Sequence, residues 1–238
     1  MSGFRRFFVE KVDDVTEICG DEYSHAINTL RIGKGDSIIL CDNSGIDYVC
    51  EVSEVRKKSF IATVIEKVEN DTETKTAVKL ICGYLKGDKT EYVVQKAVEL
   101  GVNEIVVFSS AYSSAYMSDN KLARLNKVSV EAAKQCGRSI APKVVYCDKF
   151  VEAIRIGENC KNRLFAYENI DNYTTHISSI VGDTAIVIGS EGGFSKEEVE
   201  VALSMDYNVV TLGKRILRAD TAAVCALSLV MYELGELR

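Results

Sequence analysis

The pattern of hydrophobic and polar positions along the chain changes near residue 70. Before that point, short apolar or alternating runs are separated by turn-forming residues, a pattern typical of β-strands. These runs cover residues 4–9, 37–41, 46–52 and 59–68, and a short helix is expected over residues 21–30. Strands that recur at this spacing predict a small β-barrel at the start of the chain.

The segment 69–76, Glu-Asn-Asp-Thr-Glu-Thr-Lys-Thr, is entirely polar and is the best candidate for a linker. After it, strand-like runs alternate with helix-like ones, which predicts an α/β domain with a mainly parallel sheet. We therefore divide the chain into an N-terminal barrel, residues 1–70, and an α/β domain, residues 71–238. Strands are expected over 78–82, 104–108, 144–147, 163–166, 185–188 and 209–212, and helices over 90–100, 118–136 and 219–234.

Composition narrows the class of protein. The chain has 238 residues, of which 47% are hydrophobic and 27% charged, as in a soluble globular protein. No apolar run is long enough for a membrane helix, and the first ten residues do not resemble a secretory signal. The eight cysteines form no C-x-x-C pair and only two histidines accompany them, so we expect no metal site but buried free thiols in a reducing cytoplasm. A net charge of −6 argues against nonspecific coating of nucleic acid.

A glycine-rich turn is the first candidate for chemistry. The apolar strand 185–188 runs into the turn 189–193, and Ser195 and Glu198 then form a capping-box pattern that starts a helix. Glycines let the backbone approach a ligand closely, and ligands bind at this end of strands in open α/β sheets. The pattern is neither G-x-G-x-x-G nor a Walker loop, and Glu191 would repel a phosphate. Taken alone, a tight turn without a ligand explains the segment equally well.

A basic segment at 212–222 is the second candidate. It also follows a strand and leads into a helix that Asp220 or Thr221 is expected to cap. Taken alone, it is as consistent with an ordinary basic loop. The polar residues of the helical segments 91–101 and 131–138 are, taken separately, those of solvated helix faces.

Several segments, taken in their order along the chain, resemble one family. They are FRRFFV at 4–9, the stretch 25–36 that ends in Arg-Ile-Gly-Lys-Gly-Asp, KGD at 86–88, QKAVELGV at 95–102, and EAAKQCGR at 131–138 followed by Pro142, the only proline. The loops GSEGGFS at 189–195 and LGKRILRADTA at 212–222 are similar to the family's GPEGGFS and LGPRILRTETA. The family is that of the bacterial 16S ribosomal RNA (rRNA) uridine N3-methyltransferases of the SPOUT class, which are knotted enzymes that use S-adenosylmethionine (SAM).

The chain departs from this family in both loops. Ser190 and Lys214 stand where the family usually has proline, whose fixed φ stiffens a loop. Ala219 and Asp220 replace a Thr-Glu pair, so a carboxylate is kept on a side chain that is one methylene shorter. The class of enzyme is unaffected in our interpretation, whereas the role of Asp220 stays open.

The resemblance implies a fold, a cofactor and an oligomer. It implies a small PUA-like β-barrel that binds RNA and a C-terminal SPOUT α/β domain with a deep trefoil knot, in a homodimer. SAM is expected in the knot, held largely by backbone groups of three loops. The cofactor contacts expected from the resemblance are Tyr167, Glu168, Ile188, Gly189, Gly192, Gly193, Leu212, Gly213, Ile216 and Leu217.

The resemblance also suggests how methyl transfer is assisted. Uridine N3 carries a proton and is a poor nucleophile until that proton is lost. Arg218 is our first choice for stabilising the base or an adjacent phosphate, and Asp220 and Glu191 are candidate catalytic carboxylates.

Exposed cations are expected to contact the RNA. Residues 1–70 carry nine Lys or Arg against thirteen Asp or Glu, a net charge of −4, so we expect a narrow basic patch in this domain. We therefore expect the 16S rRNA that the resemblance implies as substrate to be presented within the small ribosomal subunit. The candidate RNA contacts are Arg5, Arg6, Arg31, Lys34, Lys86, Lys89 and Arg138.

Two other interpretations are kept. The chain is a noncatalytic RNA-binding or ribosome-assembly protein that has kept the fold, or it is a related SPOUT enzyme that modifies another nucleotide or a ribose 2′-OH. A SAM titration separates the first from an enzyme, and mass mapping of the modified nucleoside separates the second.

Overall fold

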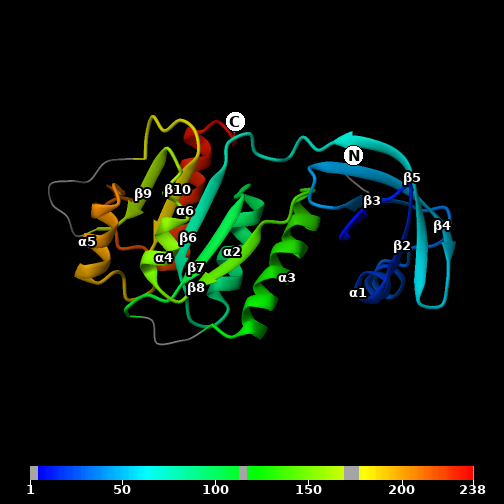
Figure 1. Ribbon diagram of the computed structural model, residues 1–238, viewed down its shortest axis with the longest axis horizontal. Helices are drawn as coiled ribbons and strands as arrows, with labels where there is room; N and C mark the ends of the chain where they lie inside the picture. The colour runs from blue at the N-terminus through cyan, green and yellow to red at the C-terminus, as the bar shows by residue number, and fades with distance from the viewer. Residues whose placement is uncertain (1–4, 113–116, 169–176, 238) are drawn as a thin grey trace. The chain divides into compact units, whose positions relative to one another are not determined.

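The computed structural model describes residues 5–112, 117–168 and 177–237. The chain forms two compact units (Figure 1). The first consists of Met1–Glu73 and Ala133–Ala141, and the second of Thr74–Ala132 and Pro142–Arg238. The two units are described separately below.

The first unit is built on a curled five-stranded sheet with the order β1-β3-β4-β5-β2. Strand β1 pairs with β3 in parallel and the other pairs are antiparallel, and two register shifts between β4 and β5 add to the curl. This half-barrel agrees with the small barrel expected from the spacing of the strands. The elements are β1 (Arg5–Phe8), β2 (Val15–Cys19), α1 (Gly20–Ser24), the π-helix η1 (His25–Thr29), β3 (Ser37–Cys41), β4 (Ile46–Val55) and β5 (Ser59–Glu69).

Strand β2 was not predicted. Only Ile18 of this strand is buried, and its neighbours Val15 and Glu17 are exposed, so the segment shows no apolar alternation. Pairing with β5 places Ile18 opposite Phe60 in the core of the unit. The strand is therefore stabilised by a sheet partner more than forty residues away, which a local pattern does not reveal.

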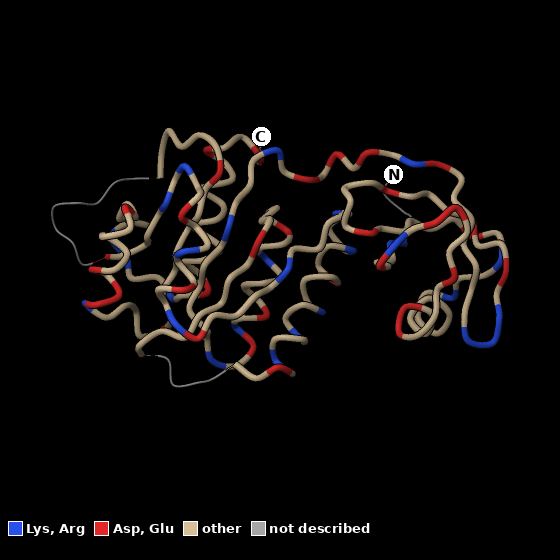
Figure 2. Tube along the Cα trace, in the orientation of Figure 1, with Lys and Arg blue, Asp and Glu red and all other residues tan. Residues whose placement is uncertain are grey.

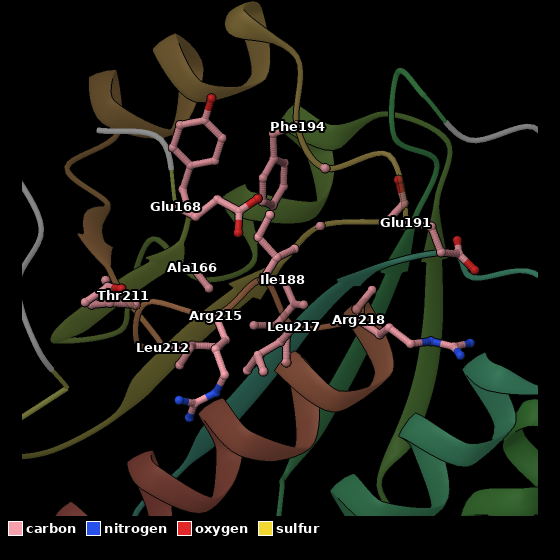
Figure 3. A pocket seen from close by; sticks show the side chains of 18 of the residues that line it. Ala166, Glu168, Ile188, Glu191, Phe194, Thr211, Leu212, Arg215, Leu217 and Arg218 are labelled. Atoms are coloured by element: carbon pink, nitrogen blue, oxygen red, sulfur yellow. The ribbon is translucent and has the colours of Figure 1, made fainter. Parts of the chain in front are cut away.

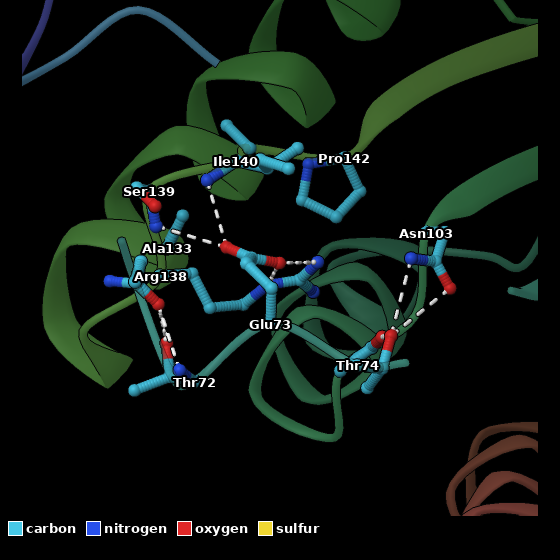
Figure 4. A network of polar contacts seen from close by, with 12 residues as sticks. Thr72, Glu73, Thr74, Asn103, Ala133, Arg138, Ser139, Ile140 and Pro142 are labelled. Carbon is cyan, nitrogen blue, oxygen red and sulfur yellow. Dashed lines mark hydrogen bonds and ion pairs between the residues drawn. The ribbon is translucent and has the colours of Figure 1, made fainter. Parts of the chain in front are cut away.

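The segment that follows helix α3 belongs to the first unit, although the sequence analysis placed it in the α/β domain. Glu73 fixes it there (Figure 4). One carboxylate oxygen accepts hydrogen bonds from Nε and Nη2 of Arg138, at 3.0 and 2.8 Å. The other accepts from the backbone N–H groups of Ser139 and Ile140, at 3.0 and 2.9 Å. Asn70 and Thr72 also donate side-chain hydrogen bonds to the carbonyl of Gly137, so several contacts besides this buried ion pair hold the segment in the first unit.

The second unit contains a six-stranded sheet with the order β11-β9-β10-β6-β7-β8, in which every pair is parallel. This confirms the expected α/β class. Helices α4 and α5 pack against one face of the sheet, while α2 packs on α6, which contacts β6 and β10. The elements are β6 (Val78–Gly83), α2 (Lys89–Glu99), β7 (Glu104–Phe108), α3 (Asp119–Cys136), β8 (Lys143–Cys147), α4 (Phe150–Arg155), β9 (Asn162–Ala166), β10 (Thr184–Ile188), α5 (Lys196–Ser204), β11 (Asn208–Val210) and α6 (Ala219–Glu233).

Most predicted elements are present within a few residues of their expected bounds. The short helix α4 was not predicted, and the predicted strand at residue 4 begins outside the described residues. Within the described part of the chain, no helix is long and apolar enough to cross a membrane, and no cluster of His, Cys, Asp or Glu is suited to a metal ion.

Candidate cofactor pocket

A pocket of about 440 Å³ lies at the carboxyl ends of three neighbouring strands of the second unit (Figure 3). Strand β9 lies between β10 and β11, and all three run in parallel, so the loops that follow them meet at one edge of the sheet. The pocket is lined by residues 166–168 after β9, 188–194 after β10, and 210–213 and 215–219 with Ala222 after β11.

All ten predicted cofactor contacts line this pocket, as do Arg218 and Glu191. The sequence analysis had chosen them from three separate segments, and the parallel order of the strands brings them together. Figure 3 shows the apolar side chains of Ile188 and Leu217 near the middle of the pocket. Which atoms bind a cofactor stays a prediction.

The glycine-rich loop after β10 packs closely against the end of β6 and against Tyr112. A Cβ atom on Gly83, the last residue of β6, would lie 2.5 Å from the backbone nitrogen of Ser190. A Cβ on Gly192 would lie 2.6 Å from Cβ of Tyr112, and Gly193 has a φ of 70°, which favours glycine. The sequence analysis missed Gly83, whose only local signal is a glycine at the end of an apolar strand.

Glu198 fixes the far end of the same loop. Its Oε2 accepts a hydrogen bond from Ser195 N at 2.8 Å, and Ser195 Oγ accepts one from Glu198 N at 3.2 Å, which confirms the predicted capping box. Its Oε1 also accepts a hydrogen bond from Ala111 N at 2.9 Å. This buried carboxylate therefore ties the loop to the segment that follows β7.

Aromatic packing anchors the loop to the core. The Phe194 ring lies 4.3 Å from the Phe165 ring and 6.3 Å from the Tyr167 ring, measured between centroids. The same cluster contains Phe108 and Phe150. Phe194 and Tyr167, which line the pocket, are thus packed against the aromatic core of the unit.

The loop between β11 and α6 is much more exposed. Lys214 and Arg215 are exposed, and Ile216 is 82% exposed although it lines the pocket. The Arg218 side chain is 70% exposed, and its Nε lies 3.6 Å from Oδ1 of Asp220. Cations on this loop are therefore accessible to an anionic substrate.

The start of α6 differs from the sequence analysis. Arg218 is the N-cap residue, and no side chain caps the helix, so the expected cap by Asp220 or Thr221 is wrong. Asp220 lies in the first turn, where its negative charge is favoured by the helix dipole. It lines a neighbouring hollow with Tyr92, Thr221, Val224 and Cys225 instead of the main pocket.

Glu191 is an ion-paired carboxylate. It accepts hydrogen bonds from Nζ of Lys89 at 2.8 Å and from the backbone N–H of Lys86 at 3.1 Å. Partial burial acts to raise the pKa of Glu191, but these hydrogen bonds outweigh it and hold the pKa below the usual value. Figure 3 shows the Glu191 and Arg218 side chains extending toward the same side of the pocket. A carboxylate with a lowered pKa is poorly suited to accept a proton at neutral pH.

Two of the candidate RNA contacts are buried in ion pairs. Arg6 donates to both carboxylate oxygens of Asp47, at 2.5 and 2.6 Å, and lies against Cys41, whose pKa burial raises to about 12. Arg138 is buried against Glu73. Both guanidinium groups are already paired and shielded from solvent, and removing either from its carboxylate would leave a buried charge unpaired, which argues against RNA binding by either. Lys89 is half-buried beside Glu191, while Arg5, Arg31, Lys34 and Lys86 are exposed.

A curled sheet followed by a parallel α/β domain with a ligand-sized pocket at its strand ends is the fold of SPOUT-class RNA methyltransferases with a PUA-like domain. Residues 72–231 match the family described as RNA methyltransferase domain, and residues 18–65 match the RNA methyltransferase PUA domain. The chain therefore belongs to the RNA methyltransferase family that these two domains define.

Individual relatives are similar along nearly the whole chain. Ribosomal RNA small subunit methyltransferase E of Bacillus subtilis is 32% identical, with 98% of each chain covered. The protein of the same name from Mesomycoplasma hyopneumoniae is 32% identical over 94% of this chain and 97% of its own length. A ribosomal RNA small subunit methyltransferase E from Neisseria gonorrhoeae, solved with S-adenosyl methionine, is 26% identical, with a TM-score of 0.88 over 97% of this chain and 98% of that one.

Proposed function

We propose that this chain uses SAM to methylate N3 of a uridine in the 16S rRNA of the small ribosomal subunit. The main observation is the pocket where three loops meet, in a chain that is 32% identical over its full length to a small-subunit rRNA methyltransferase. The pocket has the size of small-ligand sites, and its glycines leave backbone N–H and C=O groups accessible to adenine edges.

The residues present fit the cofactor. Ile188, Leu212 and Leu217 supply apolar contacts, and the Glu168 carboxylate lies in the pocket wall, where it suits a positively charged ligand. Ser190 is buried in the same wall, and its hydroxyl has no hydrogen-bond partner among the described residues. An unpaired buried hydroxyl is costly unless a ligand satisfies it. SAM supplies an electrophilic methyl group; the chain has to orient it against the uridine.

Arg218 stabilises the uridine anion that forms when N3 gives up its proton to solvent water. Its exposed guanidinium lies at the pocket rim and stabilises the uridine anion, or positions an adjacent phosphate, as N3 becomes nucleophilic. Asp220 orients Arg218 through the contact between Oδ1 and Nε. Glu191, already paired with Lys89, holds the glycine loop close to α2.

Replacing Arg218 tests this assignment. Arg218→Ala is expected to lower methyl transfer to isolated small subunits roughly 100-fold or more, while the Kd for SAM changes less than about twofold. Because the side chain is exposed, the melting temperature should not move. Arg155→Ala, which removes an exposed arginine from α4, is the matched control and should be fully active. Full activity of Arg218→Ala would sink the assignment.

The target nucleoside needs its own test. Mass mapping of rRNA from a deletion strain should show one missing N3-methyluridine, which returns when the gene is restored. A missing mark on another base or on a ribose would favour a related SPOUT activity. Failure of the purified protein to bind SAM would favour a noncatalytic RNA-binding or assembly protein.

The outer face of α6 supports a homodimer. This helix is mostly apolar between Ala222 and Tyr232, and besides its buried residues it carries the half-buried Val224 and Cys225 and the exposed Leu229 and Tyr232, which are 40% and 51% exposed. A helix that is hydrophobic all round is normally buried. A second copy of this chain is the proposed partner, and sedimentation equilibrium should give twice the mass of 26.3 kDa. We place the protein in the cytoplasm, where its substrate lies and where eight free thiols stay reduced.

A further inference from the structure

The end of the hairpin between β4 and β5 carries an unusual charge. Residues 56–58 read Arg-Lys-Lys, the only run of three consecutive cations in the sequence. The run lies where β4 ends and β5 begins, and Figure 2 shows it as a continuous blue turn. It stands out because residues 1–70 have a net charge of −4.

Arg56 is fixed within the unit. It donates two hydrogen bonds to the Glu54 carboxylate, both at 2.9 Å, and a third to Glu17 Oε1 at 3.3 Å. Ser59 Oγ donates to the same Glu17 oxygen at 2.6 Å, and the Tyr23 hydroxyl donates to the backbone carbonyl of Arg56 at 2.8 Å. These contacts order the hairpin end and engage the carboxylates of Glu54 and Glu17.

The positive charges of Lys57 and Lys58 are not paired with a carboxylate among the described residues. Both are exposed, and neither forms an ion pair with any residue that the structure describes. The turn that carries Lys34 lies beside β4, because Gly35 N donates to Val52 O at 2.8 Å and Val52 N donates to Asp36 O at 2.9 Å. The hydrogen bond from Arg56, and then the charges of Arg56 and Lys34, lower the pKa of Glu54. We call Lys34, Lys57 and Lys58 the hairpin basic patch.

Simpler explanations of the two adjacent lysines do not fit. Tight hairpin turns favour Asn, Asp or Gly, and neither position holds one. Lysines also protect edge strands from aggregation, but β4 and β5 are inner strands of the order β1-β3-β4-β5-β2. The patch therefore has no evident role within the folded unit.

We propose that the hairpin basic patch binds phosphates of the RNA substrate. This inference rests on the proposed function. Lysine ammonium groups are compact point charges suited to phosphate, and phosphate contacts position a protein on RNA without reading its sequence. Because the hairpin end is ordered in advance by Arg56, little conformational entropy is lost on binding.

The test compares two double variants of the full-length protein. Lys57→Ala/Lys58→Ala removes two charges from the patch, and Lys149→Ala/Lys196→Ala removes two exposed lysines from the second unit. Binding to isolated small subunits, measured between 50 and 300 mM salt, should be about tenfold weaker for the first variant, and its log–log salt slope should fall by about 2. The control should match the wild type, and Lys57→Arg/Lys58→Arg should restore binding.

The outcomes separate this inference from the proposed function. If the wild type methylates subunits and the patch variant binds like the control, the patch inference is overturned and the function stands. Weaker binding with an unchanged salt slope would mean that the lysines contact a ribosomal protein, which also overturns it. A wild type that neither binds SAM nor methylates subunits would refute the proposed function itself.

Discussion

The two loops that dominate the pocket are held in opposite ways. The loop after β10 is buried at both ends and is fixed there by backbone packing on Gly83, by Glu198 and by the Phe194 ring. The loop after β11 is exposed along residues 213–216, and it is held locally, as by the hydrogen bond from Gly213 N to Thr211 Oγ1 at 3.2 Å. The first is built like part of the core, and the second like a surface segment.

This difference indicates a division of labour. A fixed loop preserves the shape of a cofactor site, because small displacements of reacting groups are costly. An exposed loop that carries Lys214, Arg215 and Arg218 can meet a large anionic substrate. Substitutions in the first loop or its supports should therefore affect stability and cofactor binding together, whereas substitutions in the second should affect binding or catalysis alone.

The largest effect is expected at the support of the fixed loop. Gly83→Ala would place a Cβ atom 2.5 Å from Ser190 N, so β6 and the loop must separate. We expect a loss of about 3 kcal/mol in unfolding free energy and SAM binding weakened more than tenfold. Denaturant titration measures the unfolding free energy, and calorimetry measures SAM binding. Gly33→Ala, whose Cβ would meet only Asp36 Oδ2 at 4.0 Å, is the control and should change neither.

A smaller effect is expected at Glu198. Glu198→Ala leaves the Ser195 N–H without its acceptor and releases the segment at Ala111, at a cost of about 2 kcal/mol. SAM should bind several-fold more weakly. Glu198→Gln keeps one acceptor oxygen, so its stability and SAM affinity should lie between those of the wild type and of Glu198→Ala. If Glu198→Ala lowers stability but leaves SAM affinity unchanged, the loop does not shape the cofactor site.

The smallest effect is expected on the exposed loop. Ile216→Ala removes apolar atoms from a side chain that is 82% exposed, so the unfolding free energy should change by less than about 0.5 kcal/mol. Because Ile216 lines the pocket, SAM affinity should still fall about threefold. Thermal melting and SAM titration on one sample check both. A clear loss of stability would contradict the contrast between the loops.

The buried ion pairs show where sequence reasoning about charge fails. Arg6 and Arg138 look like the other cations in sequence, and we had assigned both to RNA. Asp47 and Glu73, the carboxylates that pair with Arg6 and Arg138, lie 41 and 65 residues away in the sequence. The run at 56–58 was visible in the sequence, but its significance depended on which carboxylates already bind Arg56. Charge in the sequence therefore did not identify which cations are accessible.

The sequence by itself determined the alternating strands and helices, the capping box at Ser195 and the ordered segments that mark the family, because these depend on local spacing. The resemblance to the family also pointed to the pocket residues, which lie in or next to the loops that follow β9, β10 and β11. Only the tertiary structure decided that Gly83 supports Ser190, that Glu198 reaches Ala111, and that 133–141 belongs to the first unit. Each of these is a contact between residues distant in sequence, and such contacts are set by the packing of the whole fold.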